Sequence, residues 1–188
     1  MTNPAPDIVI RPQTADDAAS VAAVIRAAFA DEPGVDVLEA DLARRDDSVG
    51  FVAMLGDRIV GHVRLTRGWV DAPQRLVEVV VLSPLSVVPD QQRRGIGRLL
   101  VAHAIEEADA AGAPAVFLEG DPDYYSRLGW QPASIVGVTP PSTRIPQPAC
   151  LVTVLAGHEP WMRGALVYPD TFWAHDAVGL REEDGSVT

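Results

Sequence analysis

A short glycine-containing stretch, Gln92 to Leu100, constrains this sequence more than any other segment. An apolar run from Leu82 to Val88 leads into it, and residues with helical periodicity follow it. A strand, a glycine turn and a helix in this order present backbone N–H groups to an anion. Glycine allows the close approach, and the first turn of a helix has unpaired amides. We therefore expect an anion-binding loop here, and the alternative is a glycine turn without a ligand.

The spacing of Gly95 and Gly97 separates this loop from two other phosphate-binding loops. A dinucleotide-binding fingerprint requires a third glycine, and that position holds Leu100. A Walker loop requires a lysine, and all 15 residues counted as Lys+Arg are arginines. Arg93, Arg94 and Arg98 add local positive charge to a chain whose formal net charge is -11.

Composition excludes several classes of protein. The 188 residues suffice for one domain with a sizeable core. The charge of -11 argues against binding to nucleic acid or to an anionic membrane. A single cysteine, Cys150, excludes an internal disulfide and a cysteine-rich metal site, and we expect no metal. Residues 1–7 contain no secretory signal pattern and no apolar run reaches about 20 residues, so we expect a cytoplasmic protein.

The order of the predicted elements favours a mixed α/β sheet with helices on both faces. Pro84 marks a bulge or a break, because proline removes a ladder donor, and residues 67–75 are expected to be a turn-rich connection. The hydrophobic patterns predict strands at 8–11, 51–55, 58–66, 76–88, 115–118, 151–155 and 165–168, and helices after Thr14, within 35–50, from 96 to 111 and from 122 to 129.

A second motif, Gly120-Asp121-Pro122-x-Tyr124-Tyr125, lies downstream and continues to Gly129-Trp130. The first motif, Gln-x-x-Gly-x-Gly from position 92, resembles the acyl-CoA pyrophosphate loop of the GNAT N-acetyltransferase superfamily. The second resembles the Tyr-x-x-x-Gly-Phe/Trp motif of the same family. The form Gly-Asp-Pro-x-Tyr-Tyr looks closest to a bacterial subgroup of these enzymes.

The resemblance covers about residues 8–156 and implies the GNAT acyl-CoA N-acyltransferase fold. In that fold a central, mostly antiparallel sheet is flanked by helices on both faces. We expect residues 8–156 to form the N-acetyltransferase domain. Residues 157–188 are then a C-terminal extension packed on the same domain, with a loose tail from about 181.

The resemblance further implies direct transfer of an acetyl group from acetyl-CoA to a primary amine of a small molecule or peptide. Tyr125 matches the tyrosine that protonates the leaving thiolate, whereas Tyr124 is expected to face elsewhere and to pack. A backbone N–H near Val87 or Val88 is expected to polarise the thioester carbonyl. The residues expected on the acyl-CoA are Leu85, Val87, Val88, Gln92, Arg93, Arg94, Gly95, Ile96, Gly97 and Arg98.

The two motifs do not identify the general base. Family members often use a glutamate on the fourth strand or a chain of waters. Glu78, at the far end of that strand, is the candidate; Glu119 closes the next strand, and a water relay is an equal alternative. A non-catalytic acyl-CoA-binding or regulatory module is the rival function, and the resemblance makes a homodimer one candidate assembly.

Overall fold

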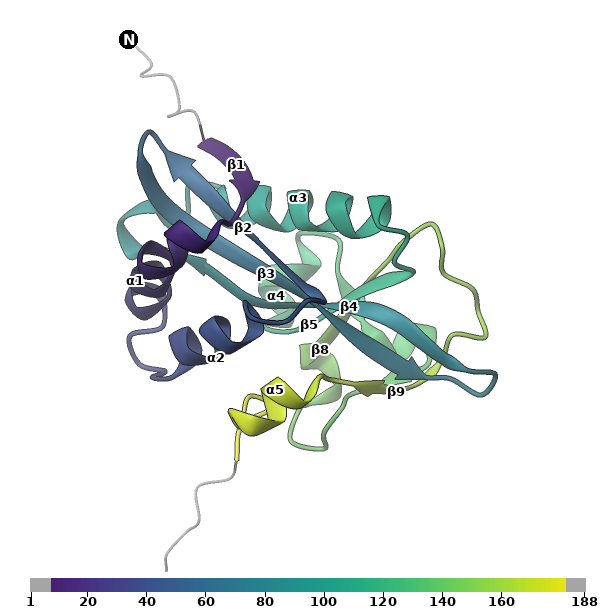
Figure 1. Cartoon of the computed structure of the whole chain (residues 1–188). Helices are drawn as coiled ribbons and strands as arrows, with labels where there is room; N and C mark the ends of the chain where they lie inside the picture. The colour runs from purple at the N-terminus through teal and green to yellow at the C-terminus, as the bar shows by residue number, and fades with distance from the viewer. Residues whose placement is uncertain (1–7, 182–188) are drawn as a thin grey trace, which may run out of the picture.

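One sheet of nine strands organises the computed structural model, which describes residues 8–181 (Figure 1). Seven strands form a continuous path: β1 (Ile8–Pro12), β2 (Ser48–Leu55), β3 (Arg58–Asp71), β4 (Leu76–Val87), β5 (Ala115–Glu119), β8 (Cys150–Val154) and β6 (Gln131–Pro132). β9 (Gly164–Val167) pairs with β3, and β7 (Val138–Thr139) pairs with β9. Within residues 8–181 two strand pairs, β4–β5 and β7–β9, are parallel and the other pairs are antiparallel, which confirms the expected mixed and mostly antiparallel sheet.

Helices cover both faces of this sheet, as the sequence predicted (Figure 1). Alternation along β3 shows the two faces, because Gly61 lies against Ile96 and Leu100 of α3, whereas Arg64 bonds Glu39 of α2. The helices are α1 (Ala18–Ala28), α2 (Val35–Leu42), α3 (Ile96–Ala110), α4 (Pro122–Ser126) and α5 (Asp170–Ala174), with 3-10 turns at Ala15–Asp17, Pro89–Gln91, Ala133–Val136 and Gln147–Ala149.

Local turn and cap signals fold as predicted. Gly56, at φ +58°, opens the two-residue turn between β2 and β3. The side chain of Asp121 accepts the N–H of Asp123 at 2.9 Å, and Pro122 is the first residue of α4. Gly112, at φ +80°, follows the end of α3.

One expectation about the central strands was wrong and another is confirmed. Residues 67–71 belong to β3 and are not a turn-rich connection, because they pair with β4 and because Trp69, Val70 and Asp71 also pair with β9. The bulge expected at Pro84 is present: β4 runs through Pro84, and a shift of register opposite β3 between Val63 and Leu65 accommodates the extra residue. The Ser83–Pro84 peptide is cis.

β4 and β5 pair over a very short length and then separate. Their register contains two pairs, Val80 with Val116 and Val81 with Phe117. β4 continues to Val87, while β5 ends at Glu119 and pairs with β8 on its other side. The edge of β4 that faces β5 is therefore open beyond Val81, next to the start of α3.

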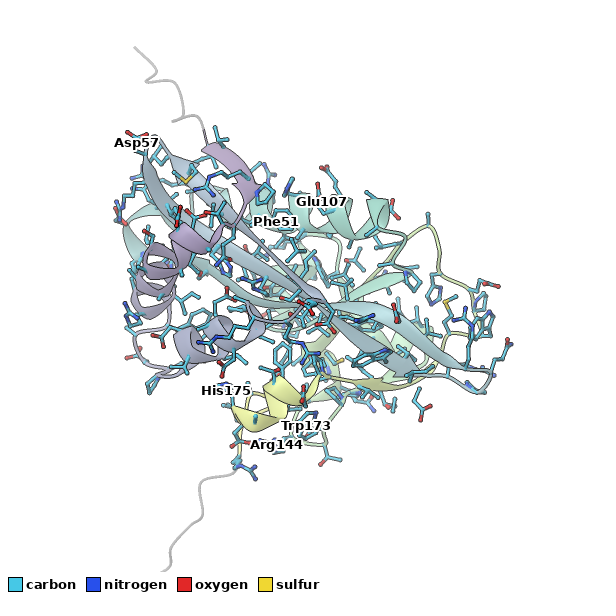
Figure 2. All side chains as sticks on the ribbon, in the orientation of Figure 1. Phe51, Asp57, Glu107, Arg144, Trp173 and His175 are labelled. Carbon is cyan, nitrogen blue, oxygen red and sulfur yellow. The ribbon has the colours of Figure 1, made fainter. Side chains whose placement is uncertain are left out.

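The C-terminal part of the described chain closes against the face that carries α2. The imidazole Nε2 of His175 lies 2.7 Å from an Oδ2 of Asp41, and Arg45 bonds Asp170 at 2.8 Å. Figure 2 shows His175 and Trp173 around α5, with Arg144 beside them. The expectations of no secretory signal in residues 1–7 and of a loose tail from about 181 concern residues 1–7 and 182–188, which lie outside the described residues. Over residues 8–181 no helix has the length and apolarity needed to cross a membrane.

Candidate active site

A crevice of about 460 Å³ opens where β4, the glycine loop and α4 meet. Both sequence motifs contribute to its wall, although they are distant in the chain. The lining residues are Leu85, Val87, Gln91, Gln92, Arg93, Gly95, Ile96, Gly97, Arg98, Tyr124, Tyr125 and Leu128.

The loop itself has the backbone of an anion cradle. Arg93 has φ +61° and Gly95 has φ +85°, and such left-handed residues turn successive N–H groups toward one side. The first intrahelical bond of α3 runs from Leu99 N–H to the Gly95 carbonyl at 3.0 Å. The amides of Ile96, Gly97 and Arg98 precede that bond and are free to bind an anion.

The two glycines of the loop are required for different reasons. A Cβ on Gly95 would meet no atom within 4 Å, so its positive φ is the constraint. A Cβ on Gly97 would lie 3.1 Å from the hydroxyl oxygen of Tyr124, so α4 approaches this point closely.

The arginines of the loop have no carboxylate partner within residues 8–181. Most arginines of residues 8–181 pair with a carboxylate, as Arg11 does with Asp17 and Arg45 does with Asp47. Within the same part of the chain, Arg93, Arg94 and Arg98 form no ion pair. In a chain of net charge -11, three unpaired guanidinium groups beside free amides favour a phosphate ligand.

The open edge of β4 presents Val87 and not Val88 to the crevice. The N–H of Val88 donates to the Val60 carbonyl at 2.9 Å, and Val88 is buried. Because backbone groups alternate along a strand, the N–H and carbonyl of Val87 face away from β3. Gln92 Nε2 donates to that carbonyl at 3.0 Å, so Gln92 ties the loop to the strand.

Two predicted cofactor residues therefore need correction. Val88 does not line the crevice, because its amide is used within the sheet and its side chain packs in the core. The Arg94 side chain is exposed and does not line the crevice, although its backbone lies between Arg93 and Gly95, which do. The structure brings the other eight predicted positions together in the crevice wall.

Tyr125 lines the crevice in a fixed orientation. Its ring packs edge-on against Trp130, with centroids 5.8 Å apart, and a Cβ on Gly120 would lie only 2.5 Å from its Cε2. Gly120 of the second motif thus provides the space for this ring. Burial, with a smaller contribution from Tyr124, raises the pKa of Tyr125, so its phenol stays protonated at neutral pH and is able to donate a proton.

Glu78 lies away from this crevice. Its side chain is 66% exposed and pairs with Arg67 at 3.2 Å, and it lies opposite Trp69 at the other end of β4. Seven residues of strand separate it from Leu85, which is about 20 Å at the usual rise. The candidate base chosen from the sequence is therefore not positioned to act there.

Glu119 is the carboxylate at the point where β4 and β5 separate. It ends β5 and pairs in register with Cys150, so its side chain shares a face with Phe117 and lies opposite α3. Although Glu119 is exposed as a whole residue, partial burial of its carboxyl group raises its pKa, against the opposing effects of a hydrogen bond from the Gly179 N–H and of Arg144. The sequence contained a signal for it, since a carboxylate directly follows a buried strand and precedes the Gly-Asp-Pro motif.

Comparison with known proteins groups the chain with acetyltransferases. The family model described as an acetyltransferase (GNAT) domain matches residues 9–133. The uncharacterized N-acetyltransferase YjhQ of Escherichia coli (strain K12) is 30% identical over 159 residues, covering 81% of this chain and 79% of YjhQ. The uncharacterized N-acetyltransferase YhbS of the same strain is 28% identical over 131 residues, covering 68% of this chain and 75% of YhbS.

Solved structures share the fold. The crystal structure of YhbS from Escherichia coli in complex with CoA has a TM-score of 0.80 at 26% identity, covering 92% of this chain and 95% of that one. A GNAT family acetyltransferase from Brucella melitensis, crystallised with acetyl-CoA, has a TM-score of 0.71 at 23% identity, covering 89% and 99% of the two chains.

Proposed function

The chain belongs to the GNAT acetyltransferase family, and we propose that this acetyl-CoA-dependent N-acetyltransferase transfers the acetyl group directly to a primary amine of a small molecule or peptide. One observation carries the proposal. The anion cradle, the open edge of β4 and the phenol of Tyr125 line the same crevice. Similarity to YhbS, which was crystallised with CoA, supports the same ligand here.

The crevice wall has hydrogen-bond donors for the diphosphate, the pantetheine arm and the thioester carbonyl of acetyl-CoA. The free amides of Ile96, Gly97 and Arg98, with the loop arginines, suit the diphosphate. The exposed edge of β4 suits the amide-containing pantetheine arm, which would add to the sheet as a strand does. The N–H of Val87 faces the same side and is our candidate for polarising the thioester carbonyl.

In the proposed chemistry the amine nitrogen attacks the thioester carbon and the carbon–sulfur bond breaks. The sulfur leaves as a thiolate, and Tyr125 transfers its phenolic proton to it. The phenol carries its proton at neutral pH when the thiolate forms, although the burial that raises the pKa of Tyr125 also makes it a weaker acid. The nitrogen of the new amide must lose one proton to a base.

We assign that base to Glu119 in place of Glu78. Glu119 lies at the gap between β4 and β5, on the face opposite α3, from which an acceptor reaches a thioester held in the gap. Its carboxylate forms no ion pair with any other residue of 8–181. The upward shift of its pKa moves it toward the range in which a carboxylate works as a base.

We further propose that residues 8–156 form the catalytic domain and that 157–188 extend it. The pairing of β9 with β3 and the bonds between α5 and Asp41 and Arg45 support a common core for the two parts. We also propose that the chain belongs to a bacterial subgroup with the Gly-Asp-Pro-x-Tyr-Tyr motif; its similarity to two Escherichia coli N-acetyltransferases supports a bacterial group.

The proposal is tested by calorimetry with CoA, followed by a thiol-release assay with acetyl-CoA and a panel of primary amines. We expect saturable binding of CoA and release of the thiol that depends on at least one amine. The absence of CoA binding would overturn the whole proposal. Binding without turnover on any amine would favour the rival non-catalytic module.

A further inference from the structure

Tyr124 occupies a different place from the packing position expected from the sequence. It lies on α4 beside Tyr125, remains 42% exposed and lines the crevice. Its hydroxyl oxygen is 3.1 Å from the point where a Cβ on Gly97 would stand. The hydroxyl therefore points over the first turn of α3, where the free amides of the cradle lie.

This hydroxyl has no partner within residues 8–181, because none of the hydrogen bonds found there involves Tyr124 Oη. The loop is lined by donors, and its backbone amides need an acceptor from outside the chain. A phenol O–H is another donor that an anion in the loop would satisfy. Packing alone does not require a hydroxyl at this position, since Phe would fill the same space.

We infer that Tyr124 is an acyl-CoA-binding residue whose hydroxyl donates to the diphosphate held over the first turn of α3. The inference rests on the proposed function, and it adds one side-chain donor to a cradle otherwise built from amides and arginines. It also accounts for Gly97, because a Cβ there would lie 3.1 Å from the phenol oxygen and would push it aside by a few tenths of an ångström.

The ring of Tyr124 links this binding site to the proposed proton donor. The rings of Tyr124 and Tyr125 meet edge to face, with centroids 4.9 Å apart and planes at 87°. Burial raises the pKa of Tyr124, which keeps its hydroxyl a donor over the neutral range. A bound diphosphate would thus fix Tyr124, and Tyr124 would fix the ring of Tyr125.

The test compares Tyr124→Phe with the wild-type chain in calorimetric titrations of CoA and of 3′-dephospho-CoA, which retains the diphosphate. We expect the Kd for CoA to rise roughly 5- to 30-fold, the range for one hydrogen bond to a charged group. The same factor is expected for 3′-dephospho-CoA, because both ligands carry the diphosphate. Ser126→Ala is the matched control, since it removes a hydroxyl from the same helix outside the crevice.

An unchanged Kd for CoA in Tyr124→Phe would overturn the inference and restore a packing role. A loss seen with CoA but not with 3′-dephospho-CoA would also overturn it, because the hydroxyl would then contact the 3′-phosphate. An equal loss in Ser126→Ala would count against it by showing a general disturbance of α4. A wild-type chain that does not bind CoA would instead overturn the proposed function, so the two failures are distinguishable.

Discussion

Two polar regions lie on opposite faces of the β3–β4 pair. In one of them hydrogen-bonding groups are left unpaired within residues 8–181, and in the other most of them bond to one another. The crevice over β4 exposes free amides, unpaired arginines and a phenol without a partner. The other region is a buried cluster of Gln13, Glu39, His62 and Arg64. Glu39 and Arg64 are each 3% exposed and His62 is 0% exposed.

Most polar groups of this cluster form hydrogen bonds with one another. Arg64 donates to both oxygens of Glu39, from Nη2 at 2.6 Å and from Nε at 2.9 Å, and His62 Nε2 lies 3.0 Å from Gln13 Oε1. Two buried atoms beside it, His62 Nδ1 and Ser86 Oγ, have no partner within the described residues. In the buried cluster the polar groups bond mainly to one another and hold the protein together. In the crevice on the opposite face they remain available for a ligand.

The largest expected effect is on stability, from Arg64→Met. Removing the guanidinium leaves the Glu39 carboxylate buried without its main partner, which costs about 3–5 kcal/mol. The free energy of unfolding by urea measures it. Arg67→Met on the same strand is the control, because Arg67 pairs at the surface and its loss has little effect. An equal free energy of unfolding for both variants would show that the buried and the surface ion pairs contribute equally to stability.

The next largest effect is on turnover, from Tyr125→Phe. The variant keeps the ring packed on Trp130 and loses only the hydroxyl group that carries the proton, so kcat falls about a hundredfold to a thousandfold. Thiol release at saturating acetyl-CoA measures kcat, and calorimetry is expected to give a CoA Kd within about twofold of wild type. An unchanged kcat would remove Tyr125 from the role of acid.

A smaller effect, with a pH signature, is expected from Glu119→Gln. The base must be deprotonated, so kcat/KM falls as pH decreases through the pKa of Glu119. Burial raises that pKa, which places the loss above pH 4.5, the ordinary glutamate value. In Glu119→Gln we expect kcat/KM to be about a hundredfold lower and to show no decrease at the pKa of Glu119. The pH dependence that comes from titration of the amine substrate should remain in both proteins. A variant with the wild-type pH profile would exclude Glu119 as the base.

The smallest effect expected is on ligand affinity, from Gly95→Ala compared with Gly112→Ala at the other end of α3. Both glycines have positive φ, +85° and +80°, and open space where a Cβ would stand, so each variant should lose about 1–2 kcal/mol of stability. Only Gly95 shapes the cradle, and we expect roughly tenfold weaker CoA binding for that variant alone. Equal CoA affinity in the two variants would show that the backbone conformation at Gly95 does not contribute to CoA binding.

Short-range signals in the sequence predicted much of this molecule. The loop from Gln92 to Gly97, the capped start of α4 at Asp121 and the hairpin at Gly56 depend on residues within a few positions of one another. The resemblance based on these motifs led to the family that the comparisons support. The expected crevice residues are mostly found together for the same reason.

Long-range contacts account for what the sequence did not predict. The extension of β3 to Asp71 has a local part, the pairing of residues 67–71 with β4, and a long-range part, the pairing of residues 69–71 with β9. β9 is about a hundred residues later in the chain, and no local pattern contains that second pairing. Likewise, Glu78 and Glu119 are both strand-end glutamates in the sequence, and only the register of β4 with its neighbours places one at the gap and the other at the far end.

By itself, therefore, the sequence determined the family, the anion-binding loop and the helix that carries the phenol, because backbone preferences of glycine, proline and capping residues act locally. The tertiary structure alone decided which amide of β4 is free, which glutamate lies where β4 and β5 separate, and where Tyr124 points. Those outcomes depend on strand register and on the approach of α4 to Gly97, and both arise from packing between segments that are distant in the chain.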